Sequence, residues 1–156
     1  MYIVMKLIDL LDKENITLDM KAHDKKSAIK ELINLLVESG KIKDADEVFR
    51  AVYEREKIGT TGIGQNVAIP HGKTTAIKKI TGAVGISRKG IEFQSLDGEP
   101  VNIVFLLLGP EDISGEHLKA LARVARLFKD KFTRDALKNA ESPERIIEII
   151  KKEDIY

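Results

Sequence analysis

Apolar side chains recur at helical spacing in two early stretches of the chain. In the segment 24–40 they return every three or four positions, and Asp24 is suited to cap the start. The segment 44–59 has the same spacing, and Asp44 followed by Glu47 is similar to a capping box. Both segments are predicted to be helices. Their expected buried stripes are Ile29, Leu32, Ile33, Leu36 and Val37 in the first, and Ala45, Val48, Phe49, Val52 and Tyr53 in the second.

Short stretches typical of strands surround these helices. The last of them is a nearly continuous apolar run, as expected of a strand buried on both faces. An Asp97-Gly98 turn signal precedes it. The predicted strands are Ile16–Leu18, Asn66–Ile69, Thr81–Ser87 and Val101–Leu108.

The C-terminal third of the chain returns to helical spacing. A helix is predicted over 115–130, with Ser114 as its N-cap and His117 in its first turn. A last helix is predicted to open at Ser142, with Pro143 at the first helical position. The expected buried stripes are Leu118, Leu121, Ala122, Ala125 and Phe128, then Ile146, Ile147, Ile149 and Ile150.

The order of these elements predicts an α/β fold. Strands lie between helices along the chain, so a mixed sheet of four or five strands should be covered on both faces. The expected architecture is a three-layer α/β/α sandwich, formed by one domain over residues 1–156.

The composition argues against several classes of function. The 156 residues carry 26 basic and 25 acidic side chains, which does not favour a nucleic-acid partner. The absence of cysteine excludes disulfides and thiolate chemistry. The longest apolar run, Ile103–Leu108, is too short to insert into a membrane, and the first residues lack the features of a signal peptide. A cytoplasmic protein is expected.

Glycines and a histidine gather in the stretch Gly59–Lys73, which reads GTTGIGQNVAIPHGK. The glycine spacing matches neither the phosphate-binding loop nor the dinucleotide-binding pattern. Glycines can instead let backbone N–H groups approach an anion closely, or permit a turn that side chains forbid.

His71 lies between Pro70 and Gly72 in this stretch. Pro70 biases Ile69 towards extended geometry, so the strand should continue to the residue before the histidine. Gly72 is then expected to let the chain turn. The imidazole should stand at the end of a buried strand, where ligands of α/β sheets commonly bind. A structural histidine is the alternative, although histidine is also the commonest acid–base ring near neutral pH.

The segment 62–72, GIGQNVAIPHG, resembles the active-site segment of a known family. It is similar to the type-2 enzyme IIA domains of the phosphoenolpyruvate-dependent sugar phosphotransferase system, the fructose/mannitol class. The resemblance extends to Arg55 in YEREKIG and to His117 in GEHLKAL, sixteen residues before and forty-six residues after His71. The segment 90–111, GIEFQSLDGEPVNIVFLLLGPE, is similar to the fructose and nitrogen-regulatory branch.

This resemblance implies a phosphoryl carrier that uses neither a cofactor nor a metal. The active histidine would accept a phosphoryl group from the phosphocarrier protein HPr and pass it to enzyme IIB, with membrane IIC involved indirectly. One departure is Asn66 where many members have glycine, but asparagine tolerates left-handed geometry. The implied site residues are His71, His117 and Arg55 as the catalytic groups, and Gly62, Gly64 and Gly72 as the phosphoryl loop.

The chemistry of these side chains suits that role. A phosphoryl acceptor needs a neutral imidazole with one exposed lone pair and its other nitrogen held by a hydrogen bond. Arg55 offers a planar fork for the phosphoryl oxygens. His117, near the positive end of its helix, should stay neutral and donate one hydrogen bond.

Other functions compete with sugar uptake of the fructose type. A nitrogen-regulatory module would use the same phosphorylation to control its binding to target proteins. A protein that only binds small anions would never form the covalent intermediate. A zinc site of His71, His117 and Glu116 lacks compact ligand spacing. The remaining histidine, His23, is expected on the surface.

Overall fold

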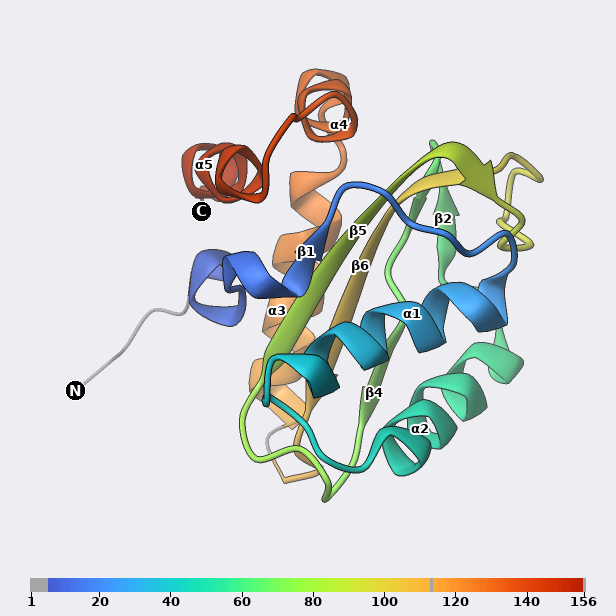
Figure 1. The fold of residues 1–156 in the computed structure, drawn as a ribbon, viewed down its shortest axis with the longest axis vertical. Helices are drawn as coiled ribbons and strands as arrows, with labels where there is room; N and C mark the ends of the chain where they lie inside the picture. Colours follow the sequence, from blue (N-terminus) through green and yellow to red (C-terminus); the bar gives the residue numbers. More distant parts are fainter. Residues whose placement is uncertain (1–5, 113, 156) are drawn as a thin grey trace.

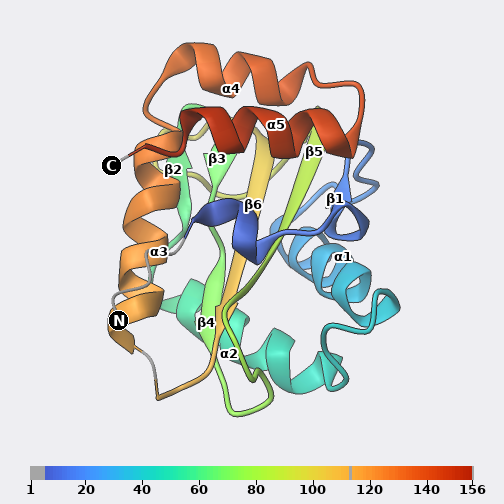
Figure 2. The ribbon, with the colours of Figure 1, turned by 90° about the vertical axis from the view of Figure 1, so that its left-hand side faces the viewer.

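The computed structural model describes residues 6–112 and 114–155, which fold into a central sheet with helices on both faces (Figure 1). This arrangement confirms the predicted α/β/α sandwich. Short 3-10 helices, η1 (Leu7–Leu10) and η2 (Lys13–Asn15), precede the first strand. One helical layer holds α1 (Lys25–Glu38) and α2 (Ala45–Ile58), and the other holds α3 (Ser114–Leu127), α4 (Lys131–Lys138) and α5 (Pro143–Glu153) (Figure 2).

Six strands in the described residues fill five positions across the sheet, because β3 and β4 follow one another along the same edge of β6. The order is β1-β5-β6-β3-β2, with β4 beside β6 below β3. β5 and β6 are antiparallel, whereas β3 and β4 both run parallel to β6, so the sheet is mixed. The strands are β1 (Ile16–Thr17), β2 (Gly62–Gly64), β3 (Val67–Ala68), β4 (His71–Lys73), β5 (Thr81–Ile91) and β6 (Val101–Gly109).

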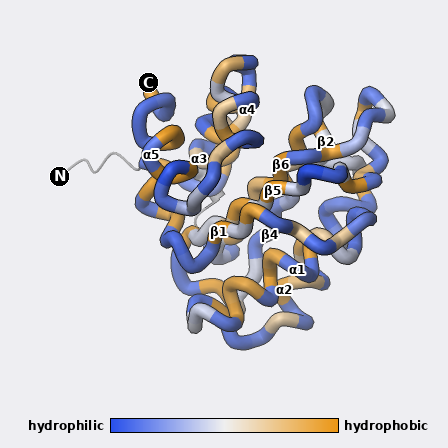
Figure 3. Tube along the Cα trace, turned by 45° about the horizontal axis from the view of Figure 1, so that its top comes forward, coloured by the Kyte–Doolittle hydropathy of each residue, from blue (hydrophilic) through white to orange (hydrophobic). Residues whose placement is uncertain are grey.

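The central strand β6 is buried along its whole length, as its apolar run predicts. Its side chains alternate between two cores: Phe105 and Leu107 pack with α3 and α5, whereas Leu106 and Leu108 pack with α1 and α2. Figure 3 shows hydrophobic positions along β5 and β6 and at intervals on the surrounding helices. Full burial of each such side chain is worth about 1.5–3 kcal/mol, so β6 anchors both layers.

Most helices begin where their capping residues predict. Asp24 accepts a hydrogen bond from the Ser27 N–H at 2.8 Å, and Asp44 accepts one from the Glu47 N–H at 3.1 Å. Ser142 caps α5, which has proline at its first position. The apolar stripes predicted for α1, α2 and α5 face the cores. None of the helices in the described residues is long and apolar enough to cross a lipid bilayer.

The predicted stripe of α3 is confirmed only in part, since Phe128 is buried and Leu121 and Ala125 pack against the core, but its two other members do not. Leu118 is 67% exposed and Ala122 is also exposed, whereas the buried positions include His117, Ala120 and Val124. The buried face is rotated because it accommodates polar side chains that a hydrophobic pattern leaves out. The helix starts at Ser114, whose side chain, predicted to be the N-cap, lies outside the described residues.

Arg123 explains much of this rotation. It lies on the buried side of α3, 7% exposed, where its guanidinium forms an ion pair of 2.8 Å with Asp154 at the end of α5. The pair draws α3 and α5 together across the η1 segment, since the Asp154 carboxylate also accepts the Leu7 N–H at 2.8 Å. A charged residue therefore occupies a position that the pattern assigned to solvent.

The short strands β2 and β4 were not predicted, because each is too short to show periodicity. β2 and β3 form a hairpin whose turn has positive φ at Gly64, Gln65 and Asn66 (94°, 57° and 68°). The prediction that Asn66 tolerates left-handed geometry is thus confirmed.

The prediction that Gly72 lets the chain turn is wrong. Gly72 lies inside β4 without a positive φ, paired with Leu108 of β6. A Cβ at this position would lie 3.0 Å from the backbone nitrogen of Val52 and 3.1 Å from its Cα. The glycine is needed because α2 packs directly against the backbone of β4.

Replacing Gly72→Ala should therefore destabilise the fold. The added methyl group must push the backbone of α2 away from β4, which typically costs about 1–3 kcal/mol. The free energy of unfolding from urea denaturation checks this. Gly59→Ala is the matched control, because a Cβ at Gly59 meets nothing within 4 Å. A Gly72→Ala protein as stable as the Gly59→Ala protein would contradict the packing argument.

Candidate functional site

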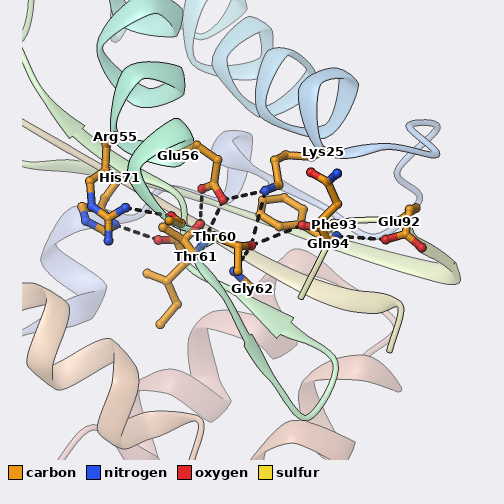
Figure 4. A network of polar contacts seen from close by, with 12 residues as sticks. Lys25, Arg55, Glu56, Thr60, Thr61, Gly62, His71, Glu92, Phe93 and Gln94 are labelled. Atoms are coloured by element: carbon orange, nitrogen blue, oxygen red, sulfur yellow. Dashed lines mark hydrogen bonds and ion pairs between the residues drawn. The ribbon is translucent and has the colours of Figure 1, made fainter. Parts of the chain in front are cut away.

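The His71 ring is held by the backbone of its own segment. It is the first residue of β4, is partly buried, and its Nδ1 lies 2.9 Å from the Ile69 carbonyl oxygen (Figure 4). A carbonyl can only accept, so the hydrogen of a neutral ring resides on Nδ1. Nε2 is then left with its lone pair. The ring has the arrangement that an acceptor of a transferred group requires.

Backbone pairing on both sides of Pro70 fixes this geometry. β3 pairs with β6 before the proline, and His71 pairs with Leu107 after it. The Pro70 carbonyl accepts the Leu107 N–H at 3.0 Å. Because proline has no N–H, the two short strands are separated at this residue without leaving an unpaired donor. The strand expected to continue to the residue before the histidine ends at Ala68 instead, and pairing resumes with β4 at His71, so the ring stands at the start of a strand rather than at its end.

His117 lies beside His71, although the two are far apart in the sequence. Their ring centroids are 6.0 Å apart, with the planes tilted by 50°. The His117 residue is 3% exposed, and its Nε2 is buried without a hydrogen-bond partner among the described residues. Gly109, at the end of β6, makes room for it, because a Cβ there would lie 2.8 Å from the ring's Cδ2. A buried nitrogen without a partner is suited to an incoming polar group.

Arg55 brings a positive charge from the last turn of α2. Its Nη1 donates a hydrogen bond of 2.8 Å to the Gly59 carbonyl, which holds the side chain over the loop that follows the helix. Figure 4 shows the guanidinium beside the His71 ring. The structure therefore brings together the three side chains predicted from the resemblance, from α2, β4 and α3.

Both imidazoles have a lowered pKa. For His71 the main cause is burial; the charge of Arg55 adds to it, while the Ile69 hydrogen bond and the charge of Glu56 act in the opposite direction. For His117 burial again comes first, then the neighbouring His71; a hydrogen bond to the Leu107 backbone acts in the opposite direction, and the charge of Lys73 lowers the pKa further. Neutral rings are thus favoured near pH 7. The first turn of α3 also disfavours a charged ring at His117.

The three glycines predicted to form the phosphoryl loop have separate packing roles. A Cβ at Gly62 would lie 2.4 Å from the Ser95 hydroxyl oxygen, so this glycine lets the backbone at Ser95 approach β2 closely. Gly64 forms the hairpin turn opposite Val67, which lies four residues before His71, about 13 Å along the strand. A contact with a phosphoryl group stays a prediction for Gly62, Gly64 and Gly72.

The sequence did not single out Glu56, although the structure places it next to the site. Its side chain is buried and forms an ion pair of 2.9 Å with Lys25 from α1. It also accepts hydrogen bonds from the backbone and hydroxyl of Thr61. A signal for it exists, since Glu56 follows Val48 and Val52 at intervals of four on the buried stripe of α2. His23, in contrast, is exposed as expected.

Exposed apolar side chains border the same site. Ile58, 83% exposed, precedes the glycine that Arg55 contacts, and Leu118, 67% exposed, follows His117. Exposed apolar side chains next in sequence to residues of the site offer apolar surface to a partner protein.

A family model describes nearly the whole chain. The model "Phosphoenolpyruvate-dependent sugar phosphotransferase system, EIIA 2" matches residues 9–153. This range includes all three side chains of the site.

Two relatives with different outputs are similar to the chain. A nitrogen regulatory protein of Bradyrhizobium diazoefficiens is 41% identical over 147 residues, which is 94% of this chain and 95% of the relative. A fructose-specific EIIABC component of Bacillus subtilis is 37% identical over 150 residues, covering 96% of this chain. The chain spans only 24% of the length of that second protein.

Solved structures share the fold. The nitrogen regulatory protein IIA-Ntr of Neisseria meningitidis superposes with a TM-score of 0.86 at 38% identity, over 92% of this chain and 98% of the other. The IIA component in the Escherichia coli complex of enzyme IIAMTL with phosphorylated enzyme IIBMTL gives 0.78 at 23% identity, over 91% and 97%. The second likeness concerns the fold alone.

The lowered pKa values predict how stability depends on pH. Each folded ring binds a proton less readily than an ordinary histidine of pKa 6.5. As the pH falls below that value, the unfolded chain takes up protons before the folded one, so the free energy of unfolding decreases. We expect a lower urea midpoint at pH 5.5 than at pH 7.5. The loss should be smaller in His117→Leu, which removes one of the two rings, and an unchanged midpoint in the native sequence would contradict the shifts.

Proposed function

Because the chain belongs to the type-2 enzyme IIA family of the phosphoenolpyruvate-dependent sugar phosphotransferase system, we propose that its phosphoryl group is carried on His71. The observation that carries this proposal is the hydrogen bond from Nδ1–H to the Ile69 carbonyl at 2.9 Å. It leaves Nε2 as the nucleophile in a neutral ring whose pKa is lowered.

The transfer is an exchange of one N–P bond for another. Nε2 of His71 attacks the phosphorus of a donor phosphohistidine, supplied by HPr. The N–P bond of the donor breaks, and its electron pair returns to the donor ring, which leaves as a neutral imidazole because its other nitrogen carries a hydrogen. No proton leaves His71, because its hydrogen stays on Nδ1 with the Ile69 carbonyl. The reaction therefore needs neither a base nor a metal, and is reversible towards the next acceptor.

Arg55 and His117 are proposed to stabilise the transferred group. Charge in the transition state is spread over three phosphoryl oxygens, so positioned donors supply most of the catalysis. The guanidinium of Arg55 offers several N–H groups in one plane. The buried Nε2 of His117 has no partner among the described residues. A neutral ring carries its hydrogen on this nitrogen only when it gives up its hydrogen bond to the Leu107 backbone, and in that tautomer it would donate to one phosphoryl oxygen.

The output of the carrier is proposed to be regulatory. The nitrogen regulatory relative has the higher identity, 41%, and matches this chain over 95% of its own length. Phosphorylation of His71 would then control binding to target proteins in the cytoplasm. Sugar uptake of the fructose type, with transfer to an enzyme IIB and indirectly to membrane IIC, is the second candidate, favoured by the 37% identity to the fructose-specific relative.

Replacing Arg55 or His117 should slow the phosphoryl transfer without unfolding the protein. Loss of one donor from a charged transition state costs about 3 kcal/mol, on the order of a hundredfold in rate. We expect this loss for Arg55→Ala, with only partial recovery in Arg55→Lys because the planar fork is missing. His117→Leu is preferred to alanine, because the ring is buried and needs a side chain of similar volume. Rapid-quench transfer from phospho-HPr measures the rates.

Two controls complete this experiment. Circular dichroism reports whether each variant is folded, and His71→Gln should take up no phosphoryl group. A folded His71→Gln protein that is labelled at the normal level would exclude His71 as the carrier. Normal rates in folded Arg55 and His117 variants would contradict the proposal that these two side chains stabilise the transferred group.

The onward step separates the two outputs. We expect phosphorylated protein mixed with a fructose-type enzyme IIB to retain its phosphoryl group over many turnovers of the HPr step, because a regulatory carrier has no need of this acceptor. The measurement compares the amount of phosphoryl label that acid removes, which is on His71, with the amount that resists acid, which is on the IIB cysteine. Rapid and complete transfer to the cysteine would overturn the regulatory assignment in favour of sugar uptake.

A further inference from the structure

Glu56 is the centre of a buried polar network behind His71, formed with Lys25, Thr60 and Thr61 (Figure 4). The Glu56 side chain is 2% exposed. It accepts the Thr61 N–H at 2.8 Å and the Thr61 hydroxyl, and lies 2.9 Å from the Lys25 ammonium. These three partners are all donors, as the ionised form of a carboxylate requires.

Burying such an ion pair is expensive, and apolar side chains of similar volume often give equal or better stability. Stability alone is therefore a weak reason for this network. Its second effect is geometric. Two hydrogen bonds from one residue fix both the backbone and the side chain of Thr61, and Lys25 reaches the neighbouring Thr60 hydroxyl at 3.3 Å. The loop between α2 and β2 is thereby held against α1.

From Thr61 the hydrogen bonds continue to the His71 ring. The Thr61 carbonyl accepts the Ile69 N–H at 3.0 Å. The Ile69 carbonyl in turn accepts Nδ1–H of His71 at 2.9 Å. A continuous path therefore runs from the Glu56 carboxylate through two backbone segments to the imidazole. Figure 4 labels Glu56, Thr61 and His71 along it.

We propose that Glu56 and Thr61 are positioning residues, which hold the Ile69 carbonyl where it keeps His71 in the Nδ1–H tautomer. This inference rests on the proposed function, since the tautomer matters because Nε2 must carry the attacking lone pair. Neither residue touches the phosphoryl group. If the loop relaxed, the carbonyl would move from the ring, and part of the population would carry its hydrogen on Nε2, where no attack is possible.

Thr61→Val is the variant that isolates this effect. It removes the hydroxyl that Glu56 binds, but it keeps the side-chain shape, the backbone and the charge pair with Lys25. Thr61→Ser restores the hydroxyl and should rescue. The readout is the tautomer of His71, from ¹⁵N chemical shifts of its ring above pH 7.5, together with the rate of transfer from phospho-HPr.

We expect one tautomer, Nδ1–H, in the native sequence and in Thr61→Ser. In Thr61→Val we expect a mixture, and a rate reduced about tenfold, as is typical when an outer partner that orients a histidine is lost. Glu56→Gln is the second variant, to be used if Thr61→Val does not fold. It keeps the volume but removes the charge, and should also mix the tautomers.

Asp154→Asn is the matched control. It breaks the other strongly buried ion pair described above, Arg123–Asp154, whose side chains are 8% and 4% exposed and which lies on the opposite face of the sheet. It should lower stability but leave the tautomer and the rate unchanged. A folded Thr61→Val protein with a single Nδ1–H tautomer and full rate would overturn the proposal, as would mixing of equal size in Asp154→Asn.

The experiment separates this proposal from the one on which it depends. The tautomer is measured without any phosphoryl donor. Failure of the native protein to accept a phosphoryl group would contradict the proposed function, whereas an unaltered tautomer in Thr61→Val would contradict only the positioning role.

Discussion

The hydrogen bond between Nδ1–H of His71 and the Ile69 carbonyl determines which ring nitrogen can act as a nucleophile. Both groups belong to a stretch of three residues interrupted by Pro70, so a proline-defined backbone sets the position of the ring. The sheet makes this stretch rigid, because β6 pairs with the chain on both sides of the interruption. The buried run of β6 thus supports the chemistry as well as the two cores.

The electrostatics of the site follow from the same burial. A phosphoryl group brings about two negative charges, and a site that met them with protonated imidazoles would lose its nucleophile. Burial lowers the pKa of both rings, and the permanent charge of Arg55 supplies attraction without any proton uptake. In the proposed mechanism, the positive charge and the nucleophile are thus supplied by different side chains.

The sequence predicts most of the fold because its helices carry clear apolar stripes and capping residues, as in α1 and α2. It is only partly right on α3, where Arg123 and His117 share the buried face with the apolar residues; a hydrophobic pattern places polar residues outside unless their partners are known. Asp154, the partner of Arg123, lies 31 residues further along the chain. β2 and β4 are too short to show a period.

The site could be predicted only in part. The frame of Pro70 and Gly72 marks His71 as unusual, but nothing in the spacing of the chain places His117 beside it, and only the resemblance to a family did so. Glu56 illustrates the opposite case. It lies four residues after Val52, so the sequence places a carboxylate on a buried stripe, where it needs a partner. The sequence does not show that the partners are Lys25 and Thr61.

The most direct test of this account is the identity of the nitrogen that carries phosphorus. Protein with ¹⁵N-labelled histidine, phosphorylated through HPr, can be studied by ³¹P and ¹⁵N NMR, since phosphorylation changes the shifts of the two ring nitrogens differently. The account predicts phosphorus on Nε2 of His71, with hydrogen retained on Nδ1. Phosphorus on Nδ1 would mean that the Ile69 carbonyl does not hold that nitrogen, and would contradict the central claim.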